Sequence, residues 1–130
     1  MFVGSLVGKE RSAVHRTLLR DWGIEVGNDT VIELGIRIMG GSPFEPVIVG
    51  PGFKNHEITR GLQGVLLPAP RSVRAAENKP SDISVSTLLE TTADSWAERD
   101  LGSLKPGGKP AFDAGIDLKG PVPVGAVAWP

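Results

Sequence analysis

Glycine and proline interrupt this chain so often that no helix or strand can run far. Glycine occurs 17 times and proline 11 times among the 130 residues. Glycine adds backbone freedom that a regular element must lose, and proline removes a hydrogen-bond donor, so both residues punctuate secondary structure. The sequence therefore predicts short elements joined by long loops.

The remaining composition allows one folded domain and excludes several functions. Leucine, isoleucine, valine and phenylalanine make up 37 of the 130 residues, well above the level of disordered sequences. The net charge of −1 gives no electrostatic case for nucleic acid as a partner. Because cysteine is absent, disulfides, thiol catalysis and cysteine-bound metals are excluded. The apolar stretch 1–8 lacks a basic flank and a cleavage site, so it does not resemble a signal peptide.

Periodic patterns predict one clear helix followed mostly by strands. The helix is expected over 10–22, where Val14, Leu18 and Trp22 recur every four residues and Gly23 provides a stop. Residues 30–38 alternate between apolar and polar, which predicts a strand with one buried face. Shorter strands are predicted at 47–49, 64–67, 72–75, 83–87 and 122–129. Short helical pieces are predicted at 55–62 and 91–98.

This order of elements predicts a single α/β domain over residues 1–130, with a partly mixed sheet. The chain starts near a helix without a leading strand and stops inside an apolar strand. Either the last strand closes the domain, or the sequence is an incomplete fragment of a larger domain.

The most unusual local sequence is 90–98, which combines three carboxylates, several hydroxyls and a tryptophan. As an active site, Glu90, Asp94 and Glu98 would carry acid–base chemistry on a glycan, with Trp96 stacked on a sugar. The alternative is a structured turn in which Asp94 caps, Glu98 returns the hydrogen bond and Trp96 fills the core. The structured turn is the favoured interpretation.

Other candidate motifs are weaker. His56 and Glu57 are adjacent on a predicted helix and do not face each other, so His56 is expected to cap a turn. Asp113 and Asp117 lack the dense ligand pattern of a calcium-binding loop. No complete nucleotide-binding glycine motif, nucleophile elbow or metal-binding histidine pair is present. The residues alone predict no enzyme, no catalytic residue, no metal and no cofactor.

Five stretches, taken in order, resemble segments of one family. They are 18–24 with 28–31, 56–59, 65–73, 88–98 and 117–128. The most specific is Leu88–Glu98, which is similar to the family pattern "Ll.Ts..SW.E". The set resembles the auxiliary component of uncharacterised ABC-type transport systems, a group that includes the bacterial gliding-motility auxiliary proteins. Glu33 and Glu57 depart from the aspartate and proline usual there.

This resemblance implies the later part of a larger Rossmann-like or glutamine-amidotransferase-like α/β domain. It implies a non-catalytic protein that acts in assembly or ligand binding with an ABC permease and ATPase, a carbohydrate being the candidate ligand. Membrane association would come through segments absent from this chain, with the soluble domain on the periplasmic or extracytoplasmic side of the inner membrane. The candidate ligand-binding residues are His56, Thr59, Ser95, Trp96 and Glu98. The alternative function is a glycan-acting hydrolase that uses Glu90, Asp94 and Glu98.

Overall fold

The computed structural model describes residues 2–3, 12–35 and 41–130. Its described α-helix is α1 (Ser12–Asp21). The helix ends where the sequence predicts, because Gly23 adopts a positive φ of 75° and its N–H donates to the carbonyl of Arg20 at 2.9 Å. A residue in this left-handed conformation stops a helix, and glycine adopts it without strain.

Short strands make up most of the described regular structure. They are β1 (Phe2–Val3), β2 (Ile24–Val26), β3 (Thr30–Glu33), β4 (Val47–Val49), β5 (Gly64–Leu66), β6 (Val73–Ala75), β7 (Ser84–Glu90), β8 (Ser95–Glu98), β9 (Leu118–Lys119) and β10 (Pro123–Trp129). Two 3-10 turns interrupt them, η1 (Gly50–Gly52) and η2 (Leu101–Leu104). The predicted strands beginning at residues 47, 64, 72, 83 and 122 are thereby confirmed, with shifts at their ends.

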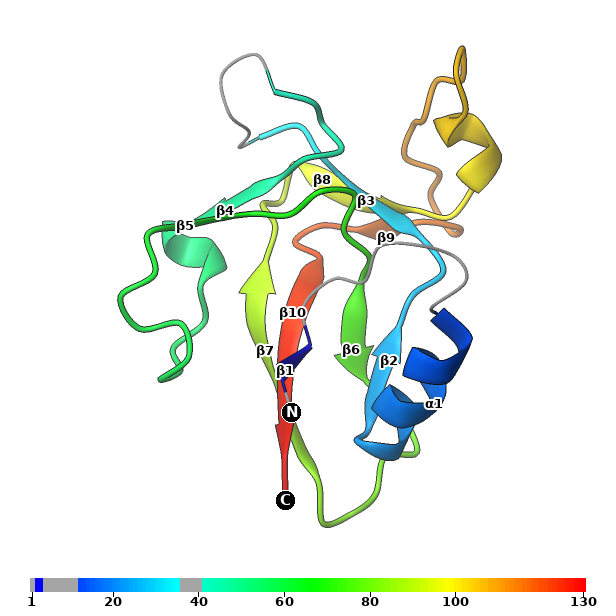
Figure 1. Cartoon of the computed structure of the whole chain (residues 1–130). Helices are drawn as coiled ribbons and strands as arrows, with labels where there is room; N and C mark the ends of the chain where they lie inside the picture. Colours follow the sequence, from blue (N-terminus) through cyan, green and yellow to red (C-terminus); the bar gives the residue numbers. More distant parts are fainter. Residues whose placement is uncertain (1, 4–11, 36–40) are drawn as a thin grey trace.

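These strands pair into four small antiparallel sheets. Their orders are β1-β10-β7, β2-β6, β3-β8-β9 and β4-β5. Figure 1 shows β7, β10, β6 and β2 next to one another in the lower half of the molecule, with α1 against β2. The β3-β8-β9 sheet crosses above them (Figure 1). The turn between β2 and β3 therefore joins the lower and upper parts.

The predicted Rossmann-like or glutamine-amidotransferase-like α/β fold is wrong. The chain has one short described helix, and the described strand pairs are all antiparallel. Parallel strands need long crossover connections, usually helical, and such connections are not seen among the described residues. The domain is mostly β.

Two buried clusters hold these sheets together. The larger one gathers apolar side chains from the strands on both halves and from the residue before β10: Val31, Ile48, Leu88, Leu89, Ala97, Val122, Val124 and Val127. In the smaller one, Leu19 of α1 packs with Ile24 of β2 and Ala128 of β10. Leu19 therefore fixes the helix to the lower sheets.

Three local predictions need correction. The strand predicted at 30–38 is confirmed over β3, but it ends at Glu33 and its one-sided burial is wrong, because Val31, Ile32 and Glu33 are all buried and Leu34 is exposed. Residues 36–38 of that prediction lie outside the described residues. Residues 55–62 form turns instead of a helix, and 95–98 form β8 instead of a helical turn. β8 lies between β3 and β9, and all four of its residues are buried. Its sequence therefore lacks the alternation of apolar and polar residues that indicates a strand.

No described helix is long and apolar enough to span a membrane.

Candidate functional site

The five residues predicted to bind a ligand lie on two separate segments. His56 and Thr59 belong to the turns between η1 and β5, whereas Ser95, Trp96 and Glu98 lie on β8. The His56 ring faces Trp129 at the end of β10, with ring centroids 6.3 Å apart. The described structure therefore does not gather the five into one site.

His56 and Thr59 shape their own turn. The Nδ1 atom of His56 accepts the N–H of Ile58 at 3.1 Å, so the expected turn-capping role is confirmed. The hydroxyl of Thr59 donates to the carbonyl of Lys54 at 2.5 Å. Thr59 is buried, so this hydrogen bond holds the turn against the domain.

Ser95 is buried in a hydroxyl network at the start of β8. Its Oγ lies 2.7 Å from Oγ1 of Thr91 and donates to the carbonyl of Thr92 at 2.6 Å. Oγ1 of Thr91 in turn accepts the N–H of Val122 at 2.9 Å. The network ties the 91–95 turn to the segment that leads into β10.

Trp96 and Glu98 share one face of β8, since strand residues two apart point the same way. The indole Nε1 of Trp96 donates to Oε2 of Glu98 at 3.1 Å, and the other carboxylate oxygen accepts the N–H of Asp100 at 3.0 Å. Trp96 is buried, as predicted, but the predicted capping pair of Asp94 and Glu98 does not form, because residues 95–98 are extended.

The three carboxylates of the hydrolase alternative do not form a group. Glu90 forms an ion pair with Lys54. Asp94 is exposed in the turn before β8, and Glu98 is buried at its far end. Extended backbone places positions 94 and 98 roughly 13 Å apart. Paired carboxylates of glycosidases stand about 5–9.5 Å apart, so this geometry does not favour the pairing.

Glu98 instead meets two other carboxylates. Ligand oxygens of Glu98, Asp113 and Asp117 lie within 4.8 Å of one another. The two oxygens of Asp117 accept the N–H groups of Arg99 and Asp113, at 2.9 and 2.8 Å. Both Glu98 oxygens also accept N–H groups, so hydrogen bonds engage the carboxylates of Glu98 and Asp117. Through the N–H of Arg99, Asp117 holds the two ends of the 99–117 segment together.

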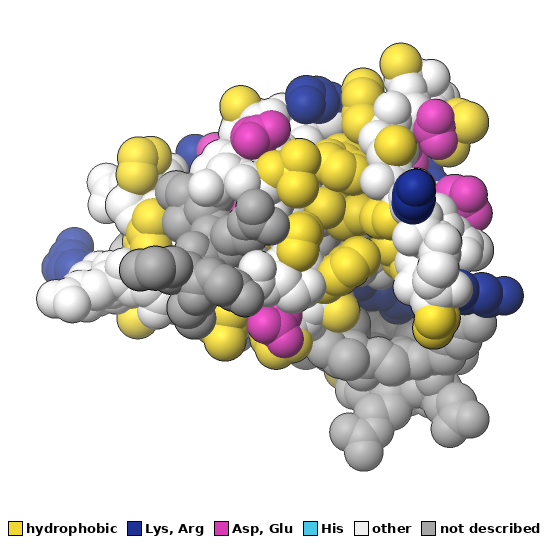
Figure 2. Space-filling view, turned by 90° about the horizontal axis from the view of Figure 1, so that it is seen from above, with side chains coloured by type: hydrophobic (Ala, Val, Ile, Leu, Met, Phe, Trp, Pro, Cys, Tyr) yellow, Lys and Arg dark blue, Asp and Glu magenta, His cyan; other side chains and the backbone are white. Residues whose placement is uncertain are grey.

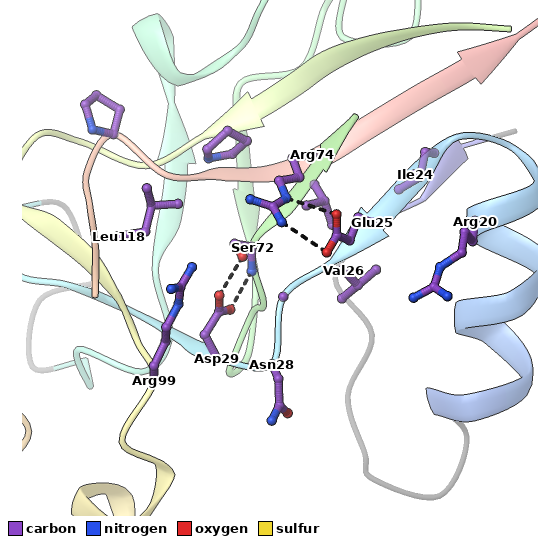
Figure 3. A pocket seen from close by; sticks show the side chains of 14 residues that line it. Arg20, Ile24, Glu25, Val26, Asn28, Asp29, Ser72, Arg74, Arg99 and Leu118 are labelled. Carbon is purple, nitrogen blue, oxygen red and sulfur yellow. Dashed lines mark hydrogen bonds and ion pairs between the residues drawn. The ribbon is translucent and has the colours of Figure 1, made fainter. Parts of the chain in front are cut away.

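A cleft of about 750 Å³ opens where the β2–β6 pair meets β9 and the end of β8. Figure 3 shows its lining, which combines charged, polar and apolar side chains. The residues are Arg20, Ile24, Glu25, Val26, Gly27, Asn28, Asp29, Ser72, Val73, Arg74, Arg99, Leu118, Pro121 and Pro123. This volume lies within the range of small-molecule sites.

Both acids in the cleft lining are engaged by neighbours. Asp29 is buried, and its carboxylate accepts the N–H and hydroxyl of Ser72 at 2.9 and 2.6 Å. Glu25 accepts Nε and Nη2 of Arg74 at 3.2 and 3.0 Å, across the β2–β6 pair. These side-chain hydrogen bonds, followed by the charge of Glu25, raise the pKa of the Arg74 guanidinium.

Arg20 and Arg99 bring cationic groups to the cleft without an acidic partner among the described residues. In Figure 3 the Arg99 side chain points into the cleft between Leu118 and Asp29, while Arg20 approaches from α1 beside Val26. The N–H of Arg99 is fixed by Asp117 at 2.9 Å, which holds this residue at the edge. The lining has three arginines against two acids, so its formal charge is positive.

No sequence motif pointed to this cleft. Its arginines come from α1, β6 and the segment after β8, and the antiparallel pairing of β2 with β6 brings them together. The one local signal is the Gly-Asn-Asp sequence at 27–29, which is typical of a turn; these residues join β2 to β3 and form part of the lining. The chain matches no family model, no curated protein and no solved structure.

Proposed function

We propose that this chain is a non-catalytic binding domain that takes a small organic anion in the arginine-lined cleft. The observation that carries the proposal is the pair of guanidinium groups, on Arg20 and Arg99, that face the cleft without an acidic partner among the described residues. Guanidinium groups bind carboxylates and phosphates through paired, charge-assisted hydrogen bonds.

The rest of the lining suits a ligand with an organic body. Val26, Leu118 and Pro121 add apolar surface beside the arginines. A small-molecule site commonly combines such apolar walls with a few polar groups that set orientation. A sugar phosphate or a small carboxylic acid offers both parts, whereas a neutral sugar leaves the cationic groups unused.

The role of the domain in an ABC-type transport system is a proposal that rests on the resemblance of the five sequence stretches. In this role the domain would act beside a permease and an ATPase, on the extracytoplasmic side of the inner membrane. Affinity purification of the natural gene product from its own cells tests this part. Co-purification with an ATPase and a permease is expected, and their absence from a stable preparation would contradict the assignment.

Ligand binding is tested by calorimetric titration with citrate, glucose 6-phosphate and glucose. The two anions should bind and glucose should not. Ligand present at about 100 times its dissociation constant should also stabilise the fold by about 2.7 kcal/mol. Arg99→Gln should weaken anion binding about tenfold or more, since hydrogen bonds to charged groups contribute about 1.5–3 kcal/mol each.

Arg60→Gln is the matched control, because Arg60 is exposed and does not line the cleft. It removes the same charge and should leave affinity unchanged. Equal binding of glucose and glucose 6-phosphate would overturn the proposal. Equal losses in the Arg99 and Arg60 variants would do so as well.

A further inference from the structure

A second pocket, of about 520 Å³, lies on the upper face of the molecule. One wall comes from β3 with Pro43 and Phe44, and the other comes from residues 103–110, which include the end of η2. Figure 2 shows hydrophobic side chains gathered in a hollow on this face. The lining residues Ile32, Leu34, Pro43, Phe44, Trp96 and Leu104 are apolar, and Lys105 and Lys109 add positive charge. The lining shares no residue with the arginine-lined cleft.

The floor of this pocket presents hydrocarbon rather than polar groups. Trp96 lies there with the only donor of its side chain, the indole N–H, already bound to Glu98 at 3.1 Å. Its cross-strand partner on β3 is Ile32, which is buried and also lines the pocket. The floor therefore offers a ligand an aromatic ring and an aliphatic chain, with no free hydrogen-bonding group from Trp96.

Backbone hydrogen bonds hold both walls. On one side, the carbonyl of Pro43 accepts the N–H of Glu33 at 3.0 Å, and that of Phe44 accepts the N–H of Ala69 at 2.7 Å. On the other, the N–H of Gly108 donates to the carbonyl of Lys105 at 2.8 Å. A Cβ at Gly108 would lie 2.0 Å from the Ser103 carbonyl oxygen, so this wall packs closely on itself. These contacts fix the backbone of Pro43, Phe44 and Gly108 in the two walls.

The two lysines give the pocket its electrostatic character. Lys105 and Lys109 are exposed, and neither ammonium group has an ion-pair or hydrogen-bond partner in the described part of the chain. Every charged residue in the described lining is one of these two lysines. An apolar interior with a positive rim is complementary to a molecule that joins a hydrocarbon body to an anionic head.

We infer that this pocket binds a single-chain amphipathic carboxylic acid from solution. The hydrocarbon chain lies against Trp96 and Phe44, and the carboxylate meets Lys105 and Lys109. Lysine suits this position because its ammonium group is a mobile point charge on a flexible stem. The inference is independent of the anion proposed for the arginine-lined cleft, because the two linings differ throughout.

The test is titration of the intact chain with decanoate, octanoate, decanol and decyltrimethylammonium below their micellar concentrations. Decanoate should bind most tightly. Each methylene removed should weaken binding about fourfold, so octanoate should bind about 16-fold less tightly. The ammonium compound should bind at least tenfold less tightly than decanoate. Equal binding of the anionic and cationic chains would overturn the inference.

Nuclear magnetic resonance locates the ligand without a mutation. Decanoate should shift the indole N–H resonance of Trp96, while those of Trp22 and Trp129, which do not line the pocket, should stay in place. Shifts confined to Trp22 or Trp129 would overturn the inference. The readout also separates this pocket from the cleft, whose lining contains no tryptophan.

A double variant tests the rim. K105Q with K109Q should weaken decanoate binding tenfold or more and leave decanol binding unchanged. The control, R60Q with K79Q, removes two positive charges that line neither this pocket nor the arginine-lined cleft and should leave decanoate binding unchanged. If the control weakens decanoate binding as much as the lysine variant, the net charge of the domain accounts for binding, and the inference fails.

Discussion

Glu33 on β3 accepts both the backbone N–H and the hydroxyl of Thr92, at 2.8 and 2.6 Å. The same carboxylate accepts the N–H of Gly35 at 2.7 Å. Glu33 is buried, with 1% of its surface exposed, and lies on a strand that the sequence predicted to turn this residue outward. The buried carboxylate fixes the 91–94 turn against β3, so its role is structural.

Replacement of Glu33 by alanine should therefore be severe. The substitution removes the charged acceptor of three part-buried hydrogen bonds, from the N–H of Gly35 and from the N–H and hydroxyl of Thr92, and we expect a loss of about 3 kcal/mol in the free energy of unfolding. Glu33→Gln keeps one oxygen and should lose less. Urea denaturation measures both, with Glu57→Ala as the control, since Glu57 is exposed and should change stability by less than about 0.5 kcal/mol. Equal losses at positions 33 and 57 would contradict the assignment.

The sequence predicted individual elements better than their assembly. The stop at Gly23 and the strand at 47–49 follow from local conformational preferences, and both are confirmed. The pairing of β3 with β8 joins residues more than 60 positions apart, and short apolar runs do not reveal such partners or their direction. The α/β interpretation failed because it requires parallel strand pairs, which long and usually helical connections join, whereas the described strand pairs are all antiparallel.

Prediction of the candidate site was limited for the same reason. Trp96 was correctly expected in the core, but Arg74 and Arg99 had no local feature that distinguished them from other exposed arginines. They enter one cleft because β6 pairs with β2 and because the carboxylate of Asp117 accepts the N–H of Arg99 and fixes the segment after β8. Long-range pairing creates the site, so a search for local motifs misses it.

Gly120 provides a second prediction, since its position leaves no room for a side chain. An added Cβ would lie 2.2 Å from Oγ of Ser95 and 2.6 Å from the carbonyl oxygen of Thr92. Gly120→Ala must displace this turn, and we expect a loss of about 3 kcal/mol, the upper part of the range for overpacking. Gly64→Ala is the control, because its Cβ meets only ordinary contacts of 3.8 Å or more. Thermal denaturation that gives the same midpoint for both variants would show that the turn is looser than described.

A third prediction concerns Glu98 and separates the structural role from the hydrolase alternative. Glu98→Gln keeps one acceptor oxygen but turns an amide donor toward either Trp96 Nε1 or the N–H of Asp100. An unsatisfied buried donor costs about 1–3 kcal/mol, so stability should fall by about 2 kcal/mol. The near-ultraviolet circular dichroism of Trp96 should weaken in parallel. A glycan-hydrolysing activity in the parent that vanishes in a fully stable variant would instead establish the alternative.

The ion pair between Glu25 and Arg74 makes little difference to stability, and this forms a fourth prediction. The two side chains are exposed by 39% and 61%, and exposed pairs contribute about 0–1 kcal/mol. The pKa of Arg74 is raised in the folded state. The stabilisation that Arg74 contributes is therefore complete at any pH below the pKa of the unfolded chain, and it is lost only as the pH rises through the pKa of the folded chain. The contribution should therefore stay constant between about pH 5 and about pH 9. A comparison of Arg74→Gln with the parent by urea denaturation across this range checks the expectation, and a stability difference that varies by more than about 1 kcal/mol would contradict it.

The same pair yields a last prediction, which links the structure to the proposed ligand. Glu25 neutralises Arg74 inside the arginine-lined cleft, so Glu25→Gln removes a competing acid and raises the positive charge that faces an incoming anion. Citrate and glucose 6-phosphate should then bind several-fold more tightly in calorimetric titration, with a steeper dependence on salt. Glu57→Gln makes the same change in net charge outside the cleft and should leave affinity unaltered. If Glu25→Gln weakens anion binding, then Glu25 serves the ligand by orienting Arg74, and the free arginines cannot be the main source of affinity.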